Sequence, residues 1–449
     1  MAQVSQKHPA ERVPTQRELR REILGLAIPA FATLVAEPAL LLADSAIIGH
    51  LGTTQLAGLA IAGSIITVIT GLCLFLAYGT TATVARRLGA GDRAAALAGG
   101  IDGIVLGVIL GTAVCVAIQL VHDPLLGLYQ PPPDVAEAAG VYLRIASIGL
   151  PALLVMLAST GVLRGLQDTK TPLKVAIGVN LSNIALNFLL VYGAGLGIAG
   201  AALGTVLSQY AAAAFLSTVV IRGARAEGTP LQFHPGGILA AARSGVWLMF
   251  RSLWLQISVT TTTAIATHQG AAALAGHQIG NSIWQFLAFA LDAIAIAAQA
   301  IIGRYLGAGA AGTVRRLTGT MIWWGIGCGI LFGLIILAIR QFLSPVFTTD
   351  PAVATQLESM LLIVAALQPI AGVVFVLDGV LIGAGDARYL ALAGLIALLA
   401  YLPLALLVDQ NSAGLQLLWV AYGGYMLARM ITLAVRARTS SWMVLGSDR

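Results

Sequence analysis

The sequence predicts an all-α polytopic membrane protein in which about twelve transmembrane helices form two six-helix lobes. Its composition is the first reason. Hydrophobic residues make up 58% and charged residues 10% of the 449, with a mean hydropathy of +0.90, whereas about a quarter of the residues of a soluble domain are charged. The second reason is the length of the apolar runs: residues 101–121 suit a spanning helix and lack the short alternating segments of a β-barrel. The third is an internal repeat.

At roughly 20 apolar residues per span, the helices follow one another along the chain with short loops between them. Six are expected in the first half, near residues 23–48, 56–80, 97–121, 138–163, 172–193 and 196–221. Six more are expected near residues 241–267, 273–302, 317–343, 354–382, 388–408 and 414–435. Because six is even, both halves have the same orientation, which predicts pseudo-two-fold symmetry about an axis along the membrane normal.

The two halves match when one is shifted by 218 positions. Gly52 then falls on Gly270, residues 88–91 (LGAG) fall on the identical residues 306–309, and Asp168 falls on Asp386. One register kept over several elements indicates a duplicated bundle. In an apolar chain this is the layout of secondary transporters, which hold their cargo between two repeats.

The basic residues orient the chain. Arg and Lys collect in the N-terminal tail and in every second loop, while the alternate loops around 49–55, 122–137, 194–195, 268–272 and 409–413 contain neither. The positive-inside rule then places both termini in the cytoplasm, in a multi-pass protein of the inner (cytoplasmic) cell membrane. We therefore interpret the net charge of +6 as a topology signal, and we do not expect nucleic-acid binding.

This topology predicts five parts. They are a cytoplasmic N-terminal tail (1–22), an N-terminal lobe (23–221), a cytoplasmic linker between the lobes (222–240), a C-terminal lobe (241–435) and a cytoplasmic C-terminal tail (436–449). Since the first apolar run is long enough to span the membrane, no cleavable signal peptide is expected.

Several function classes are not favoured. Cys73, Cys115 and Cys328 fall inside apolar spans without paired spacing, so neither disulfides nor a cysteine metal site is expected. The sequence contains neither the glycine-rich ATP-binding motif nor a hydrolase constellation. We therefore expect no enzyme and no cofactor, and energy for pumping would come from an ion gradient or a separate subunit.

The first helix carries two acids in hydrocarbon. Glu37 and Asp44 are seven residues apart, so their side chains lie on the same face of a helix. Pro38 between them removes a backbone hydrogen bond and can bend the helix, which predicts a gate beside the acids. Charged groups are kept in a membrane mainly where they face a cavity. In the alternative interpretation, Asp44 marks the water-facing end of the helix and Glu37 caps a kink.

The fifth helix carries three amides. Asn180, Asn183 and Asn187 follow helical spacing on an otherwise apolar helix. Such a stripe must face protein or a water-filled cavity, because lipid would leave the amides unsatisfied. The three side chains either hold helices together or bind the first-helix acids in one protonation state and release them in the other.

The second half differs at the matching positions. Asp44 maps to Thr262, and Asn180, Asn183 and Asn187 map to Leu398, Tyr401 and Ala405, so the cluster of acid and amides belongs to the first half. Polar residues of the second half occur on the eighth helix and the tenth: Gln278, Asn281, Gln285, Asp292, Gln299 and Asp378. Asp292 and Asp378 either have a structural role, as an ion pair with Arg251 or as a cap, or bind cargo, with Trp284 and Phe286 stacking beside Gln285.

Four segments of the chain resemble one transporter family. They are LADSAIIGHLG (42–52), RGLQDTKTP (164–172), LDAIAIAAQ (291–299) and LDGVLIGAGD (377–386). In this order they are similar to the multidrug and toxic compound extrusion (MATE) transporters, most of all to the DinF-like branch, over about residues 20–435. The resemblance implies two lobes that rock around a central cleft and export organic compounds, driven by protons or sodium.

The resemblance also implies roles for particular residues. The family's coupling carboxylate corresponds to Asp44, and its partners on the fifth helix correspond to Asn183 and Asn187. Where well-known members have Asn-x-x-x-Asp, this chain has Asn-x-x-x-Asn, which leaves fewer carboxylates for a bare cation. A single carboxylate removed from water takes up a proton readily, so we favour protons. Sodium is the alternative, because Glu37 would add a second charge and amide carbonyls can ligate sodium.

These features predict a monomeric antiporter in the lipid bilayer. With the cleft open to the outside, Asp44 takes up a proton, its contacts to the asparagines rearrange, the helix bends near Pro38, and cargo leaves. The family implies amphiphilic, often cationic organic cargo. A lipid-linked precursor flippase of the same superfamily is a rival. It should have helices beyond twelve and a cluster of basic residues in the cleft to hold pyrophosphate, and Arg144, Arg251 and Arg429 are too few and scattered to favour it. An intramembrane enzyme or a channel is a more distant rival.

Overall fold

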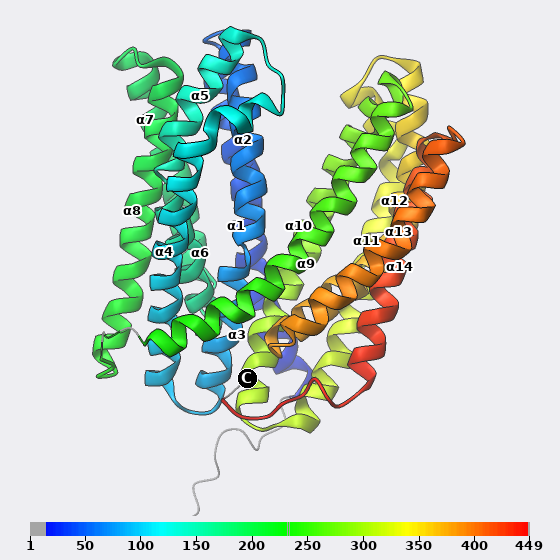
Figure 1. The fold of residues 1–449 in the computed structure, drawn as a ribbon. Coiled ribbons are helices and arrows are strands. Elements are labelled where there is room, and N and C mark those ends of the chain that lie inside the picture. The colour runs from blue at the N-terminus through cyan, green and yellow to red at the C-terminus, as the bar shows by residue number, and fades with distance from the viewer. Residues whose placement is uncertain (1–14, 231, 233, 448–449) are drawn as a thin grey trace, which may run out of the picture. The chain divides into compact units, whose positions relative to one another are not determined.

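The structure, a computed structural model, describes residues 15–230, 232 and 234–447 (Figure 1). Its elements are all helical, and no strand occurs among the described residues. The helices of the first half are α1 (Gln16–Gly49), α2 (Thr53–Cys73), α3 (Phe75–Gly89), α4 (Arg93–Gly127), α5 (Pro133–Ser147), α6 (Leu150–Gly165), α7 (Lys170–Asn187), the π-helix η2 (Phe188–Gly193) and α8 (Gly197–Ala226). Those of the second half are α9 (Pro235–His268), α10 (Ala271–Gly307), α11 (Ala311–Phe347), α12 (Pro351–Gly383), α13 (Ala387–Gln410) and α14 (Gly414–Arg438).

The elements account for the predicted spans. Within the described residues, ten helices are long and apolar enough to cross a membrane, or eleven if the bent pair α5 and α6 is one span. The remaining predicted span is α9, which has 34 residues but carries Arg243, Arg251 and a run of threonines (260–263). The predicted all-α polytopic fold class is confirmed.

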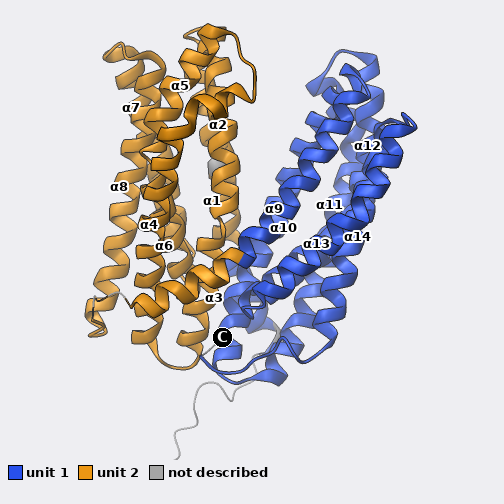
Figure 2. Ribbon diagram, in the orientation of Figure 1, with its two compact units in different colours: residues 1–27, 247–449 blue, residues 28–246 orange. Residues whose placement is uncertain are grey.

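The chain divides into two compact units, with boundaries after Ala27 and after Val246 (Figure 2). Unit 2 contains residues 28–246, and unit 1 contains the preceding residues together with those from Trp247 onward. Both α1 and α9 therefore begin in one unit and continue in the other. Local contacts explain this: Glu22 on α1 pairs with Arg304 within unit 1, and the buried Asp102 accepts a hydrogen bond from the His234 backbone N–H at 2.9 Å within unit 2.

The helices extend further than their apolar stretches. Since α8 continues to Ala226 and α9 begins at Pro235, only residues 227–234 connect them, which is less than the predicted linker over 222–240. The end turns of α8 and α9 lie outside the apolar stretches from which spans are predicted. They are helical all the same, because an established helix adds residues at low cost.

Close helix contacts repeat under the shift of 218 positions, which confirms the duplication. A Cβ at Gly58 would lie 2.8 Å from Ala138 Cβ, and one at the matching Gly276 would lie 3.1 Å from the matching Gln356 Cβ. Further matched pairs are Gly111 against Pro151 with Gly329 against Pro369, and Gly161 against Ala77 with Gly379 against Ala295. Small residues at these places let two backbones approach closely, as is usual between membrane helices.

The first half is the more broken of the two. The long helices α10 and α12 are continuous, whereas their counterparts are divided into α2 and α3 and into α5 and α6, the latter bent by 49°. Pro151 and its counterpart Pro369 occur in both halves, so proline alone does not cause the bend. Gly149, where the second half has Leu367, lowers helix propensity at the break.

Candidate functional site

The site in unit 2 is built around Asp44, which lies near the end of α1 with 5% of its surface exposed. Asn187, the last residue of α7, donates a hydrogen bond from Nδ2 to Asp44 Oδ1 at 2.7 Å and is fully buried. The same Nδ2 lies 2.9 Å from the side-chain amide of Asn183. The predicted association of the first-helix acid with the stripe of asparagines is therefore present, at least for two of its members.

The amide of Asn183 has an orientation that satisfies both of its polar atoms. The nitrogen and oxygen of an amide are told apart by their hydrogen-bond partners. With Nδ2 turned toward the acid, it donates to Asp44 Oδ1 at 2.9 Å, and Oδ1 accepts from the Thr205 hydroxyl on α8 at 2.9 Å. In that orientation two amide N–H groups converge on one carboxylate oxygen, which stabilises the ionised acid in a buried place.

Two further hydrogen bonds tie α1 to the helix that carries the amides. Asn180 donates from Nδ2 to the Ala36 carbonyl at 2.6 Å, and the hydroxyl of Tyr192 donates to the Ile47 carbonyl at 2.6 Å. They lie on either side of Asp44 along α1. Between them α1 continues as one helix through Pro38, so the predicted bending at this proline stays a prediction. The side chain of Glu37 lies outside the described residues.

The local backbone brings Asn187 to the acid. A residue larger than glycine at position 204 would push the Asn187 amide away, because its Cβ would lie 2.2 Å from Asn187 Oδ1. The chain then passes directly from Asn187 into η2, and π-helical turns often occur at functional sites because they rotate the following side chains out of the α-helical phase. Gly204 and η2 thus place the amide and Tyr192 toward α1.

Sequence reasoning missed three residues of this site. Thr205 and Gly204 lie on α8, and Tyr142 is a buried residue of α5 that interacts with Thr205. A threonine in a membrane helix usually bonds its own helix, and the Thr205 hydroxyl also lies 3.1 Å from the Ala201 carbonyl. Nothing in its type or spacing distinguishes it from threonines without a role.

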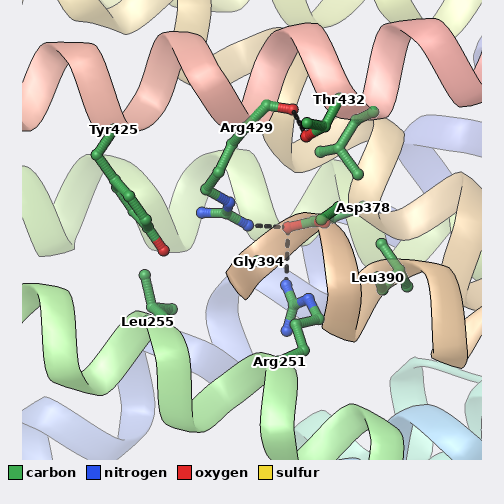
Figure 3. Close-up of a pocket in the computed structure, with 10 residues that line it drawn as sticks. Arg251, Leu255, Asp378, Leu390, Gly394, Tyr425, Arg429 and Thr432 are labelled. Carbon is green, nitrogen blue, oxygen red and sulfur yellow. Dashed lines mark hydrogen bonds and ion pairs between the residues drawn. The ribbon is translucent and has the colours of Figure 1, made fainter. Parts of the chain in front are cut away.

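In unit 1 the acid Asp378 on α12 lies between two arginines (Figure 3). Its Oδ2 accepts a hydrogen bond from Arg251 on α9 at 2.8 Å and another from Arg429 on α14. The predicted ion pair of Asp378 with Arg251 is confirmed. The interpretation of Arg251 and Arg429 as scattered was wrong, because helix packing brings both to one carboxylate.

This ionic cluster is compact. The cavity beside it has a volume of about 10 Å³, which is roughly the space of a single water molecule. Two guanidiniums and one carboxylate give the cluster one net positive charge. The arrangement suits a structural tie between α9, α12 and α14, and a role of Asp378 in binding cargo stays a prediction.

The other predicted cargo contacts are distributed around α10. Trp284 is buried and meets Trp419 and Tyr422 edge to face, at centroid distances of 5.8 Å each. Gln285 is exposed, because neighbouring residues of a helix point about 100° apart. Asn281 and Asp292 are partly buried. Their roles toward cargo stay predictions.

The chain is similar to known transporters over most of its length. A family model described as MatE matches residues 29–189 and 248–407. The chain is 30% identical to Protein DETOXIFICATION 44, chloroplastic, of Arabidopsis thaliana, over 95% of this chain and 84% of that protein. It is 28% identical to DNA damage-inducible protein F of Escherichia coli K12, over 91% and 90%. The crystal structure of the Vibrio cholerae MATE transporter VcmN in the bent form superposes with a TM-score of 0.86 at 24% identity, over 95% and 99%.

Proposed function

The chain belongs to the MATE family of multidrug efflux transporters, and from this premise we propose that it exports organic compounds in exchange for protons, with Asp44 as the coupling carboxylate. Members of this family are secondary transporters and not enzymes, and the chain is a multi-pass membrane protein. The proposal adds the ion, the residue that carries it and the direction of transport.

The observation that carries the proposal is the hydrogen bond from Asn187 to the buried Asp44. In the ionised acid, Oδ1 accepts from the amide N–H. A protonated acid becomes a donor and needs an acceptor. Asn187 Oδ1 is buried and has no hydrogen-bond partner among the described residues, so a turn of this amide would supply one. Proton uptake therefore reverses a hydrogen bond between α1 and α7 and favours a different packing of the two helices.

The groups around Asp44 support protons over sodium. Sodium requires several oxygen ligands. Asn187, and Asn183 in the orientation that satisfies its hydrogen bonds, both turn N–H groups toward the acid instead. Each N–H occupies a lone pair that a cation would use. Coupling to sodium is the alternative, and it would require both amides to turn their carbonyls toward Asp44.

For the cargo we propose amphiphilic organic compounds, often cationic, which enter from the cytoplasmic side. This direction rests on the positive-inside rule applied to the basic loops, by which we propose that both termini lie in the cytoplasm and that the protein lies in the inner membrane. We propose that Asp292, Gln285 and the aromatic residues of α10 contact the cargo. Asp378 is held by two arginines and attracts cations weakly.

The test is transport by the purified protein in proteoliposomes with separately imposed gradients. A proton gradient alone should drive accumulation of a fluorescent organic cation, and a sodium gradient at equal pH should not. Accumulation driven by sodium alone would contradict the choice of ion, and failure of both gradients would contradict secondary transport of that compound. Liposomes that contain Asp44→Asn protein are the control for leak.

A further inference from the structure

A larger pocket in unit 1 has no part in the proposed transport cycle. It has a volume of about 400 Å³ and lies where α11, α12, α14 and the segment after α14 meet, which is within the usual size range of ligand pockets, about 300–1,000 Å³. Its lining includes two arginines, one hydroxyl and a set of apolar side chains: Arg315, Arg438, Thr318, Ile322, Leu377 and Trp442.

The segment after α14 forms a fixed wall of this pocket. Trp442 is 1% exposed, and its Nε1 donates to the Ala437 carbonyl at 3.3 Å. The Gly446 backbone N–H donates to the carbonyl of Leu306 on α10 at 3.1 Å. Arg436 anchors the base of the segment by donating from Nε to Asp386 at 2.7 Å. The pocket is therefore a built feature of the fold.

Its polar end is arranged for an anion. Arg315 and Arg438 are exposed, and neither forms an ion pair within 4.0 Å in the part of the chain that the structure describes. Thr318 is 6% exposed, lines the pocket, and its hydroxyl has no hydrogen-bond partner among the described residues. Two guanidiniums match the oxygens of a phosphate group. The buried Thr318 hydroxyl would reach the same oxygens only after its side chain rotates.

Its other end is apolar and lies on membrane-spanning helices. Ile322 and Val373 are partly exposed residues of α11 and α12, and Leu377 lies beneath them, while both helices are long and apolar enough to span the bilayer. Arg315 is in the first turns of α11, on the side of the basic loops. The pocket thus joins a basic end, near the first turns of α11, to an apolar end on helices that can span the bilayer.

We propose that this pocket binds one acidic phospholipid of the leaflet on the side of the basic loops. Its phosphate lies between Arg315 and Arg438 and, once the Thr318 side chain has rotated, accepts a hydrogen bond from that hydroxyl. An acyl chain lies along Ile322, Val373 and Leu377. Basic pockets between membrane helices on this side attract acidic headgroups. A free phosphate would leave the apolar end empty, and a zwitterionic lipid would lack the net charge that two arginines select.

The experiment measures lipids retained by the purified full chain, by native mass spectrometry, with phosphatidylglycerol and phosphatidylcholine of the same acyl chains. The double variant Arg315→Ala with Arg438→Ala should reduce the apparent affinity for phosphatidylglycerol by about tenfold, because each basic residue near the surface adds to the attraction. Arg316→Ala is the matched control, since Arg316 is exposed beside Arg315 but does not line the pocket. It should bind as the original protein does.

A second pair of variants fills the pocket and keeps its charge. Gly319 lines it, and a Cβ there meets no atom within 4 Å, so Gly319→Leu should fold and should displace the lipid. Gly327, equally open on α11 but outside the pocket, is the control as Gly327→Leu.

Equal retention of phosphatidylglycerol by the arginine double variant or by Gly319→Leu would overturn the proposal. So would equal affinity for phosphatidylcholine, or full competition by inorganic phosphate alone. Because binding is measured without any gradient, none of these results depends on the role of Asp44.

Discussion

Thr262 and Tyr401 are joined by a buried hydrogen bond of 2.6 Å between their hydroxyls, and they occupy the positions that match Asp44 and Asn183 under the internal repeat. Both halves therefore keep a polar contact between their first and fifth helices. In the first half it includes a carboxylate, and in the second it joins two neutral hydroxyls. The polar contact is thus present in both halves, but a group that can change its charge, the Asp44 carboxylate, is present at this contact only in the first half.

This relationship predicts that Tyr401→Phe leaves coupling intact. Thr262 still donates to the Ser258 carbonyl at 2.8 Å in the variant, so the loss is one hydrogen bond, about 0.5–1.5 kcal/mol. The free energy of unfolding should fall by that amount, and proton-driven uptake into vesicles should be unchanged for equal amounts of folded protein. Loss of uptake at normal stability would show that the second half also takes part in coupling.

The cluster of Asp378 predicts a large loss of stability when the acid alone is removed. Asp378→Asn leaves the buried Arg429 and the partly buried Arg251 without their shared carboxylate and should destabilise the protein by about 3–5 kcal/mol. Adding Arg251→Leu removes one of the stranded charges and should recover part of the loss. Thermal unfolding of the two single variants and the double variant checks this.

If Asp378 binds cationic cargo instead, the result differs. Asp378→Asn would then lose more affinity for cationic than for neutral compounds, and it would unfold at the same temperature as the original protein. The ionic tie would also be contradicted if the losses of stability caused by Asp378→Asn and Arg251→Leu simply added in the double variant.

The topology predicts which side of the membrane each loop faces. Thr53, the first residue of α2, and Ser412, between α13 and α14, are exposed at connections that lack basic residues. Single cysteines there, in a chain without its three native ones, should react with an impermeant reagent added outside cells. A cysteine at the exposed position 170, in a basic loop, should react only after the membrane is opened. The opposite pattern would reverse the orientation and change export into import.

Much of the fold was predictable, because a membrane imposes length and composition on every span. The repeat predicted more than the number of helices, since contacts such as Gly58 with Ala138 recur at Gly276 with Gln356. The first turns of α1 belong to unit 1 and those of α9 to unit 2, which was not predictable. It depends on contacts between polar residues outside the apolar stretches, such as Glu22 with Arg304.

The site was predictable in part for a related reason. Asp44, Asn183 and Asn187 stand out because polar groups in an apolar helix need partners, and the structure brings them together. Thr205 does not stand out, since its hydroxyl can bond its own helix. Arg251 and Arg429 each stand out, but only the packing of α9, α12 and α14 shows that they share one acid.

The central claim is that Asp44 couples cargo to protons, and its most direct test is Asp44→Asn. The amide keeps the size and hydrogen bonding of the acid but cannot titrate, so the two conformations lose their difference in proton affinity and a gradient shifts no population. Asp123→Asn, at an exposed acid outside the site, is the control. Glu37→Gln should be milder if Glu37 only tunes Asp44 and equally severe if the two acids share the ion.

The measurement is proton-gradient-driven uptake into inverted vesicles, beside direct binding of the same fluorescent compound to the purified variant. We predict that Asp44→Asn binds the compound and remains folded but shows no gradient-driven uptake, while Asp123→Asn transports normally. Full gradient-driven uptake by Asp44→Asn would contradict the assignment of Asp44 as the coupling residue.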